Sequence, residues 1–309
     1  MRTVHLFDEL KNFCEVTLWT TQLHKVPEEA EKYSVKQIDP QQLRFPKTGT
    51  FVIVGTYFPI GWWIRYTYPK RIILIHNADL TPREFHRKLR QLSNNGRRKV
   101  EVLYASESLK RSVDHPGTVQ TSLIDIDRFS PPDRKPSDSN SGFTVGRLSR
   151  AVPKKHHPDD PALYRRLVDH GCSVRIMGAT PPLMKELGGL ESVTLLPALA
   201  QEAHLFLQGL DCFLYRTSEE WFEPSGRVIT EAMACGLPIV CHSRGGYAEI
   251  IEHGRNGFLF ETQGEALEIV LQIKEDGALR ESVGRAARET AEEMFSTGHR
   301  SEIVEFYLR

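Results

Sequence analysis

The stretch EPSGRVITEAMACGLPIV, residues 223–240, indicates most directly which fold the chain adopts. Pro224 and Ser225 are residue types that begin helices, and Gly236 followed by Pro238 is a common helix end. The residues after Pro238 are apolar and β-branched, which is typical of a short buried strand. This stretch therefore predicts a loop, a helix and a strand in succession.

The same alternation extends along the whole chain. Strands that are apolar on both faces and alternate with helices are typical of parallel sheets covered on both sides. We expect strands at residues 15–20, 50–58, 71–77, 99–106, 143–148, 173–179, 192–197, 211–216, 237–243 and 256–260. The predicted fold class is α/β with doubly wound parallel sheets.

Length and one polar segment indicate two domains. The chain has 309 residues, more than one domain usually contains. The segment SPPDRKPSDSNSG at 130–142 is rich in Pro and Ser and lacks large apolar residues, as linkers do. We predict an N-terminal domain at 1–133, a linker at 134–142 and a C-terminal domain at 143–290. Residues 291–309 are predicted to be a helix that packs back on the N-terminal domain.

Composition excludes several classes of protein. The 40 Lys and Arg balance the 40 Asp and Glu, so no nucleic-acid partner is expected. The five cysteines have neither C-x-x-C pairs nor zinc-like spacing, which argues against disulfides and a structural metal. We see no signal peptide and no apolar run long enough to span a membrane, and we predict a cytoplasmic protein.

Two carboxylates flank the start of the helix predicted within 223–240. Glu223 precedes the helix and Glu231 lies about two turns into it, which separates them by roughly 10 Å along the axis. Gly226 allows close backbone approach, and the free N–H groups of a helix start favour a phosphate. The spacing fits a ligand with two polyols joined by a pyrophosphate. One Glu favouring the helix dipole and one solvated Glu is the alternative.

The glutamates, spaced E-x7-E and followed by CGLPIV, resemble the signature of the GT-B-fold glycosyltransferases of the large retaining family 4. The resemblance extends through VGRLS (145–149), Gly178, SRGGYAEII (243–251) and HGRNGFLF (253–260). It covers most of residues 143–260. The resemblance implies two Rossmann-like domains that face a cleft.

The resemblance also assigns roles to individual residues. It places Glu223 at the hydroxyls of the donor sugar and Glu231 at the nucleotide ribose. Arg147 and Lys155 match the Arg and Lys that neutralise the diphosphate, although the gap between them is longer than usual and Lys154 is also close. The other residues expected at the nucleotide are Gly146, Lys154, Gly226, Arg227 and Val228.

In the N-terminal half, RIILIHN places His76 where the family has a histidine near the reacting sugar. A packed, hydrogen-bonded histidine is the alternative, because spacing does not show where the ring points. The helical face of Val4, Phe7, Leu10 and Cys14 suggests that the chain begins inside the family's first helix. We therefore expect an N-terminal sheet without its first strand and an incomplete acceptor side.

Two motifs imitate metal sites. Asp125 and Asp127 have the D-x-D form of metal-dependent transferases, but they match the family's interdomain Asp-x-Phe-x-Pro segment. The run His156-His157-Pro158-Asp159-Asp160 leads into a predicted helix, and adjacent residues rarely converge on one ion. We predict no metal and no cofactor other than the nucleotide-diphosphate sugar.

The segment PREFHRKLRQLSNNGRRK at 82–99 carries seven cations and one acid. These cations are Arg83, Arg87, Lys88, Arg90, Arg97, Arg98 and Lys99. Such a surface attracts anionic membranes, since each exposed cation adds about 1 kcal/mol of binding. Peripheral contact with the inner face of the membrane is one interpretation, and a solvated helix face is the other.

The sequence thus predicts a retaining glycosyltransferase that moves a sugar from a nucleotide-diphosphate donor to a hydroxyl acceptor in glycan, lipopolysaccharide or glycoconjugate biosynthesis. Its partners would be the donor and a glycan, lipid-linked or small-molecule acceptor. One alternative is a non-catalytic nucleotide-sugar-binding or partner subunit, suggested by the short N-terminus. The other is an epimerase or phosphorylase of the same fold.

Overall fold

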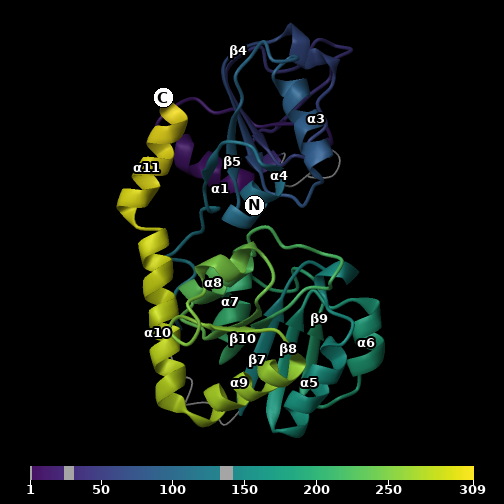
Figure 1. Cartoon of the computed structure of the whole chain (residues 1–309), viewed down its shortest axis with the longest axis vertical. Coiled ribbons are helices and arrows are strands. Elements are labelled where there is room, and N and C mark those ends of the chain that lie inside the picture. Colours follow the sequence, from purple (N-terminus) through teal and green to yellow (C-terminus); the bar gives the residue numbers. More distant parts are fainter. Residues whose placement is uncertain (1, 24–30, 133–141) are drawn as a thin grey trace. The chain divides into compact units, whose positions relative to one another are not determined.

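The computed structural model describes residues 2–23, 31–132 and 142–309. The chain forms two compact units (Figure 1). Unit 1 comprises Met1–Leu123 and Thr297–Arg309, and unit 2 comprises Ile124–Ser296. The predicted linker at 134–142 falls outside the described residues except for Gly142. No helix in the described ranges is long and apolar enough to cross a membrane.

Unit 2 is built on a six-stranded parallel sheet in the order β12-β11-β10-β7-β8-β9. Its strands are β7 (Phe143–Leu148), β8 (Cys172–Met177), β9 (Val193–Leu196), β10 (Cys212–Tyr215), β11 (Ile239–His242) and β12 (Phe258–Phe260). This is the strand order of a doubly wound sheet. The chain adds strands towards one edge from β7 to β9 and towards the other edge from β10 to β12, so the strand order reverses between β7 and β10. All six strands predicted for the C-terminal domain are present.

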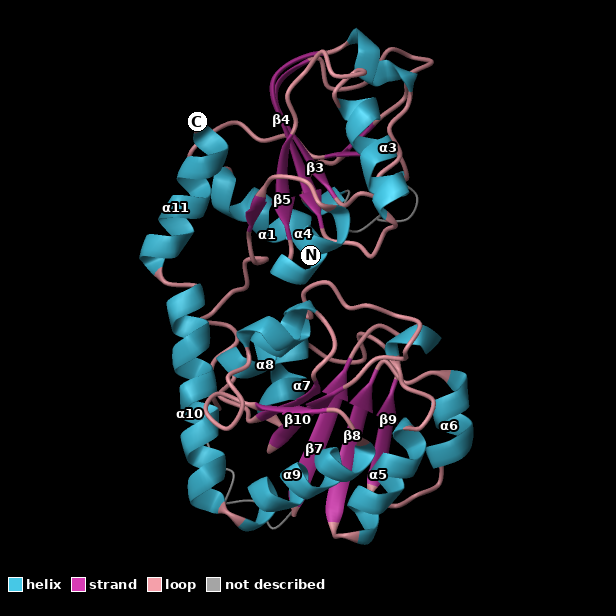
Figure 2. Ribbon diagram, viewed as in Figure 1, coloured by secondary structure: helices cyan, strands magenta, loops and turns pink. Residues whose placement is uncertain are grey.

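Helices surround this sheet (Figure 2). They are η4 (Pro153–Lys155), α5 (Asp160–Asp169), α6 (Pro181–Leu187), α7 (Ala203–Gln208), α8 (Arg227–Ala234), η5 (Gly246–Ile250), α9 (Gln263–Glu275) and α10 (Gly277–Met294). Helix α5 contacts α6 and α9, and α8 contacts β11 and α10. Apolar side chains such as Val145, Ile176 and Leu214 form the core between sheet and helices. The two-faced burial predicted from sequence is therefore present.

Unit 1 contains a four-stranded parallel sheet in the order β3-β4-β5-β6. The elements of this sheet and its coverings are β3 (Thr48–Val54), η2 (Trp62–Tyr66), β4 (Tyr68–His76), α3 (Pro82–Leu92), β5 (Glu101–Tyr104), α4 (Glu107–Val113) and β6 (Thr118–Val119). Its four strands lie side by side in the order in which they occur in the chain, so the strand order has no reversal point among the described residues. Its core includes Ile72, Leu74 and Phe85.

The strand predicted at 15–20 is much shorter than expected. Only β1 (Trp19–Thr20) is extended, and it pairs with β2 (Lys36–Gln37) as a separate two-stranded sheet. Strand β2 was not predictable from composition, because both of its residues are polar and exposed. Residues 15–20 thus do not extend the main sheet.

Two helices that are far apart in the sequence meet in unit 1. Helix α1 (Arg2–Leu10) contacts α11 (Thr297–Leu308), and Arg300 forms an ion pair with Glu9 (Figure 1). Tyr307 donates a hydrogen bond of 2.7 Å to Gln120, and Arg71 donates one to the carbonyl of Phe306. These contacts attach the last segment to unit 1.

Candidate functional site

The candidate site lies at the point where the strand order of the unit 2 sheet reverses, between β7 and β10. Arg147 is near the carboxyl end of β7, and Tyr215 is the last residue of β10. Lys155 ends η4, which follows β7, and Glu223 lies in the loop between β10 and α8. Ligands of doubly wound sheets bind at this position, because the loops there leave the sheet in opposite directions.

Lys155 and Glu223 form an ion pair that is almost buried. Their side chains are 11% and 12% exposed, although 68 residues separate them in the sequence. The Tyr215 hydroxyl donates to the same carboxylate oxygen over 3.2 Å, and the indole N–H of Trp221 donates over 3.4 Å. Burial raises the pKa of Tyr215, so its hydroxyl stays protonated and remains a donor. A buried carboxylate needs such partners to stay ionised.

Arg147 is buried beside this pair, with only 1% of its surface exposed. Its guanidinium donates to the carbonyl of Lys155 and stacks over the Tyr215 ring at 4.6 Å. No described carboxylate forms an ion pair with it, since Lys155 takes Glu223 and Arg216 takes Asp160. A buried cation without an ion-pair partner favours the binding of an anion.

His156 holds the guanidinium of Arg147 in place. Arg147 Nε donates to His156 Nδ1 over 3.2 Å, and His156 Nε2 lies 3.0 Å from the carbonyl of Gly178. A carbonyl only accepts, so Nε2 carries the proton and Nδ1 is the acceptor. Burial, with the charge of Arg147, lowers the pKa of His156 to about 3. The ring is therefore neutral, as both hydrogen bonds require.

Helix α8 begins next to these residues at Gly226. Gly226 has φ 55° and ψ 49°, and a Cβ there would lie 2.7 Å from Cβ of Tyr247. Only glycine satisfies both the left-handed backbone and this contact. Gly226 itself has no side chain to cap the helix start, and among the described residues no side chain accepts from the N–H of Val228.

Glu231 is buried on α8 and pairs with Arg227 one turn earlier, over 2.9 Å. Burial raises the pKa of Glu231, while Arg227 opposes this shift. Glu231, the predicted ribose contact, is thus already paired with Arg227, which we also expected at the nucleotide. A ligand hydroxyl would share this carboxylate with Arg227.

Two of the predicted residues do not join the cluster. Lys154 is exposed and lies 3.3 Å from the equally exposed Glu220. Gly146 lies inside β7, and a Cβ there would overlap the side chain of Leu210. Gly146 is therefore explained by packing, and Lys155 is the better placed of the two lysines.

His76 lies in unit 1, at the end of β4, and is fully buried. Its Nδ1 is 2.9 Å from the Thr56 hydroxyl, and its ring contacts those of Phe85 and Tyr104 at 4.8 and 5.8 Å. Nε2 is buried without a hydrogen-bond partner. Burial lowers the pKa of His76 to about 4, so the ring is neutral near pH 7. These contacts fit the alternative of a packed, hydrogen-bonded histidine. A sugar would reach the ring only after local rearrangement.

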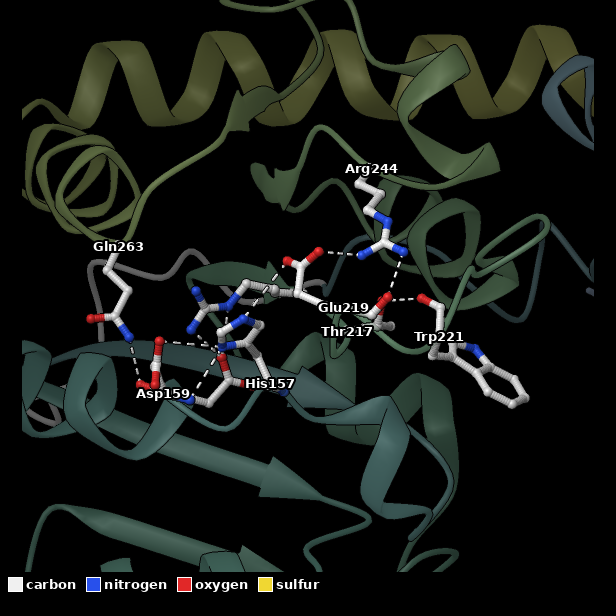
Figure 3. A network of polar contacts seen from close by, with 9 residues as sticks. His157, Asp159, Thr217, Glu219, Trp221, Arg244 and Gln263 are labelled. Carbon is white, nitrogen blue, oxygen red and sulfur yellow. Dashed lines mark hydrogen bonds and ion pairs between the residues drawn. The ribbon is translucent and has the colours of Figure 1, made fainter.

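The residues of the two metal-like motifs have other contacts. Asp125 accepts from the backbone N–H of Arg128, and Asp160 pairs with Arg216 over 2.8 Å with both side chains buried. His157 lies 3.8 Å from Asp159 and 3.9 Å from Glu219 within a polar network (Figure 3). Within the described ranges no group of three or more His, Cys, Asp or Glu residues could hold a metal ion.

The same network fixes the loop that leads to Glu223. Arg244 pairs with Glu219, and Thr217 donates over 3.1 Å to the carbonyl of Trp221 (Figure 3). On the other side of the network, Gln263 donates over 2.7 Å to the carbonyl of Asp159. The loop between β10 and α8 is therefore tied to the segment after β11, and the loop before α5 is tied to α9.

Sequence reasoning missed the residues that support the charged ones. His156 was considered only as a metal ligand, and Tyr215 and Trp221 received no role. One signal was available for Tyr215, since a strand at the reversal point that ends in an aromatic residue directs that ring towards the site. His156 gave no such signal, because its contacts come from β7 and from the end of β8.

Comparisons with known proteins identify the family and the fold. The family of glycosyl transferases group 1 matches residues 128–290, more than half of the chain. Spore coat protein SA of Bacillus subtilis is 41% identical over 81 residues, which are 25% of this chain and 22% of that protein. Each of the first curated relatives is matched over less than a quarter of its length.

Solved structures show the same fold over a larger part of the chain. A glycosyltransferase from Rickettsia africae has a TM-score of 0.69 at 14% identity and covers 99% of this chain and 93% of its own. Anabaena HepE in complex with UDP has a TM-score of 0.62 at 23% identity, covering 76% of this chain and 71% of its own. With the doubly wound sheet of unit 2 and the charged cluster at its reversal point, these matches show that the chain belongs to the glycosyl transferases group 1 family and has the GT-B fold.

Proposed function

We propose that the protein is a glycosyltransferase that moves a sugar from a nucleotide-diphosphate sugar to a hydroxyl acceptor, with retention of anomeric configuration. The observation that carries this proposal is the convergence of Arg147, Lys155 and Glu223 beside the uncapped start of α8. Cations and free N–H groups suit a diphosphate, and a carboxylate between donors suits a sugar hydroxyl.

Each residue then has a distinct role. Arg147, Lys155 and the N–H groups after Gly226 hold the diphosphate and stabilise the negative charge that grows on it as the glycosidic bond breaks. Glu223 accepts hydrogen bonds from the donor sugar, and Glu231 accepts them from the ribose. Because Lys155 and Glu223 pair with each other in the structure, donor binding must redistribute the Lys155 ammonium between carboxylate and phosphate.

No side chain of unit 2 is assigned as a general base. The leaving phosphate would accept the acceptor's proton on the face from which it departs, which accounts for retention and needs no metal. His76 is neutral and buried, so it could contact the reacting sugar only if the loop after β3 rearranges.

The donor and acceptor are proposed by class. The structure of HepE with UDP suggests a uridine diphosphate donor. The acceptor is a glycan, a lipid-linked saccharide or a small molecule. We place the protein in the cytoplasm, where its five free cysteines stay reduced. Peripheral contact with the inner face of the membrane stays a prediction; of the basic segment, Lys88 and Arg98 donate hydrogen bonds to backbone carbonyls of unit 1.

Glu223→Ala tests the proposal. We expect this variant to lose sugar transfer from UDP-glucose, or from the donor found by thermal-shift screening, while its circular dichroism spectrum stays that of the wild type. Glu220→Ala is the matched control, since Glu220 lies three residues away, is exposed and pairs only with exposed Lys154. Full turnover by Glu223→Ala would refute the assignment.

The same assay separates the alternatives. Donor binding by calorimetry without hydrolysis or transfer across a panel of acceptors would indicate a non-catalytic nucleotide-sugar-binding subunit. A requirement for inorganic phosphate would indicate a phosphorylase, and a product formed without acceptor an epimerase. Proton NMR of the first-formed product reports whether the anomeric configuration is retained.

A further inference from the structure

Unit 1 has a hollow of about 400 Å³ between η2 and the second half of α3. Its charged lining residues are Arg65 from η2 and Arg87 and Arg90 from α3. Side chains that bear amides also line it: Gln91, Asn94 and Asn95. Trp62 completes the wall with an aromatic ring. None of these residues belongs to the proposed donor site, which lies in unit 2.

None of the three arginines is within ion-pair distance of a carboxylate in the part of the chain that the structure describes, although Glu84 is close enough to Arg87 to interact with its charge. All three are exposed, and none forms an ion pair there. Arg83, Arg87 and Arg90 follow one another at helical spacing on α3, and like charges so placed destabilise a helix. Glu84 is the only acid of α3, and its carboxylate accepts from the N–H and hydroxyl of Thr81 at the helix start. An anion bound in the hollow would offset this repulsion.

Trp62 is held in a defined orientation although it is 52% exposed. Its ring meets Tyr66 edge to face at 5.5 Å and Phe45 at 6.4 Å, with interplanar angles of 89° and 75°. An exposed tryptophan fixed in this way costs little ordering entropy when a flat apolar surface packs on it. The C–H face of a pyranose ring is such a surface.

We propose that this hollow binds an acidic oligosaccharide, with its carboxylate or phosphate groups on Arg65, Arg87 and Arg90 and one sugar ring on Trp62. Guanidinium groups bind carboxylates and phosphates in bidentate fashion, and amides satisfy both donors and acceptors among sugar hydroxyls. The concave shape and the amides favour a saccharide, whose hydroxyls those amides can bind, over a flat lipid surface. The proposal goes beyond the donor site and does not require it.

Binding of hexagalacturonate by the full chain, measured by calorimetry, tests the proposal. The wild type should bind hexagalacturonate but neither its fully methyl-esterified form nor hexaglutamate, which carries the charge without the sugar. Replacing Arg87 and Arg90 together by Gln should weaken binding about tenfold or more. Trp62→Ala should also weaken it, and Trp62→Phe should restore most of the affinity.

The matched control replaces Arg166 and Lys185 by Gln, because both are exposed cations on helices of unit 2. It removes the same charge and should bind like the wild type. Four results would overturn the proposal: no binding by the wild type, equal affinity in the Arg87/Arg90 variant and the control, equal binding of hexaglutamate, or binding only to phosphatidylglycerol vesicles. A separate titration with UDP-glucose measures the donor site of unit 2. Failure of that site is therefore distinguished from failure of the hollow in unit 1.

Discussion

At the scale of single residues, His156 is a positioning residue for the proposed donor site, because it fixes Arg147 without facing the ligand itself. Its neutral ring accepts from Arg147 and donates to the carbonyl of Gly178. Replacing it changes the geometry of a cation rather than removing the cation. That difference can be measured.

We expect His156→Phe to weaken UDP binding about three- to tenfold, the usual effect of one lost hydrogen bond. His156→Gln keeps an acceptor and a donor on one side chain and should restore part of the affinity. Calorimetry with UDP at pH 7.5 measures both, and His170→Phe, at an exposed position on the same unit, is the control. If His156→Gln binds no better than His156→Phe, the hydrogen bond has no positioning role.

The buried neutral histidines predict how stability depends on pH. The pKa of His76 falls from 6.5 to about 4 on folding, so between these values the unfolded chain binds a proton that the folded chain does not. Stability is therefore complete above pH 6.5 and decreases as the pH falls towards 4. For His76 alone the loss between pH 6.5 and 4.5 should be about 2 kcal/mol.

Urea unfolding followed by the signal of unit 1 at several pH values checks this slope. His76→Leu should lower stability at pH 7.5 but show a shallower decrease towards pH 4.5 than the wild type. An unchanged slope would mean that His76 titrates alike in the folded and unfolded chains.

At the residue scale the sequence located candidate residues through spacing and family resemblance, and it missed what packing decides. Glu223 was singled out by its place before a helix start together with the resemblance to family 4, and Lys155 by that resemblance alone. The roles assigned to both residues remain predictions. The sequence did not reveal that Gly146 serves Leu210 or that His76 is enclosed by Phe85 and Tyr104, since those neighbours come from distant segments.

At the scale of elements, the start of α8 depends on one glycine. Gly226→Ala would impose a left-handed backbone on a residue with a Cβ and drive that atom into Tyr247. We expect a loss of about 2–4 kcal/mol in the stability of unit 2 together with weaker UDP binding.

Gly254→Ala is the control for Gly226→Ala, because Gly254 also has a positive φ, of 80°, but nothing lies within 4 Å of the added Cβ. Gly254→Ala should lose about 1–2 kcal/mol of stability, the cost of a left-handed backbone alone, and should keep the UDP affinity of the wild type. Thermal unfolding and calorimetry compare the two variants. Equal losses in both would show that Tyr247 adds no constraint.

The start of α5 and the loop after β10 are joined by the buried pair of Asp160 and Arg216. Asp160→Ala leaves a buried guanidinium without a partner and should destabilise unit 2 by about 3–5 kcal/mol. Replacing both residues, Asp160→Leu with Arg216→Met, should recover most of that loss. Urea unfolding tests this, and a double variant as unstable as Asp160→Ala would contradict it.

Elements were predictable in proportion to their apolar content. The six strands of unit 2 are buried on both faces, so their composition differs clearly from that of the loops. In unit 1, β2 and β6 have only two residues each, mostly polar or partly exposed, and neither was predicted. Short strands of this kind depend on backbone pairing, which composition does not report.

At the scale of the whole molecule, each unit has an apolar core of its own. We therefore expect two thermal transitions by calorimetry. Phe85→Ala, in the core of unit 1, should lower one of them, and UDP-glucose at about 100 times its dissociation constant should stabilise the other by about 2.7 kcal/mol. A single transition that both changes shift equally would show that the units unfold together.

The attachment of α11 to unit 1 has a consequence for biosynthesis. Unit 2 is one continuous segment, whereas unit 1 includes residues 297–309, which the ribosome adds after all of unit 2. The buried core of unit 1 lies within residues 38–113 and is complete in the chain before unit 2 is translated. The contacts of α11 with α1, Arg71 and Gln120 form only after that, so α11 joins a sheet that has been synthesised long before it.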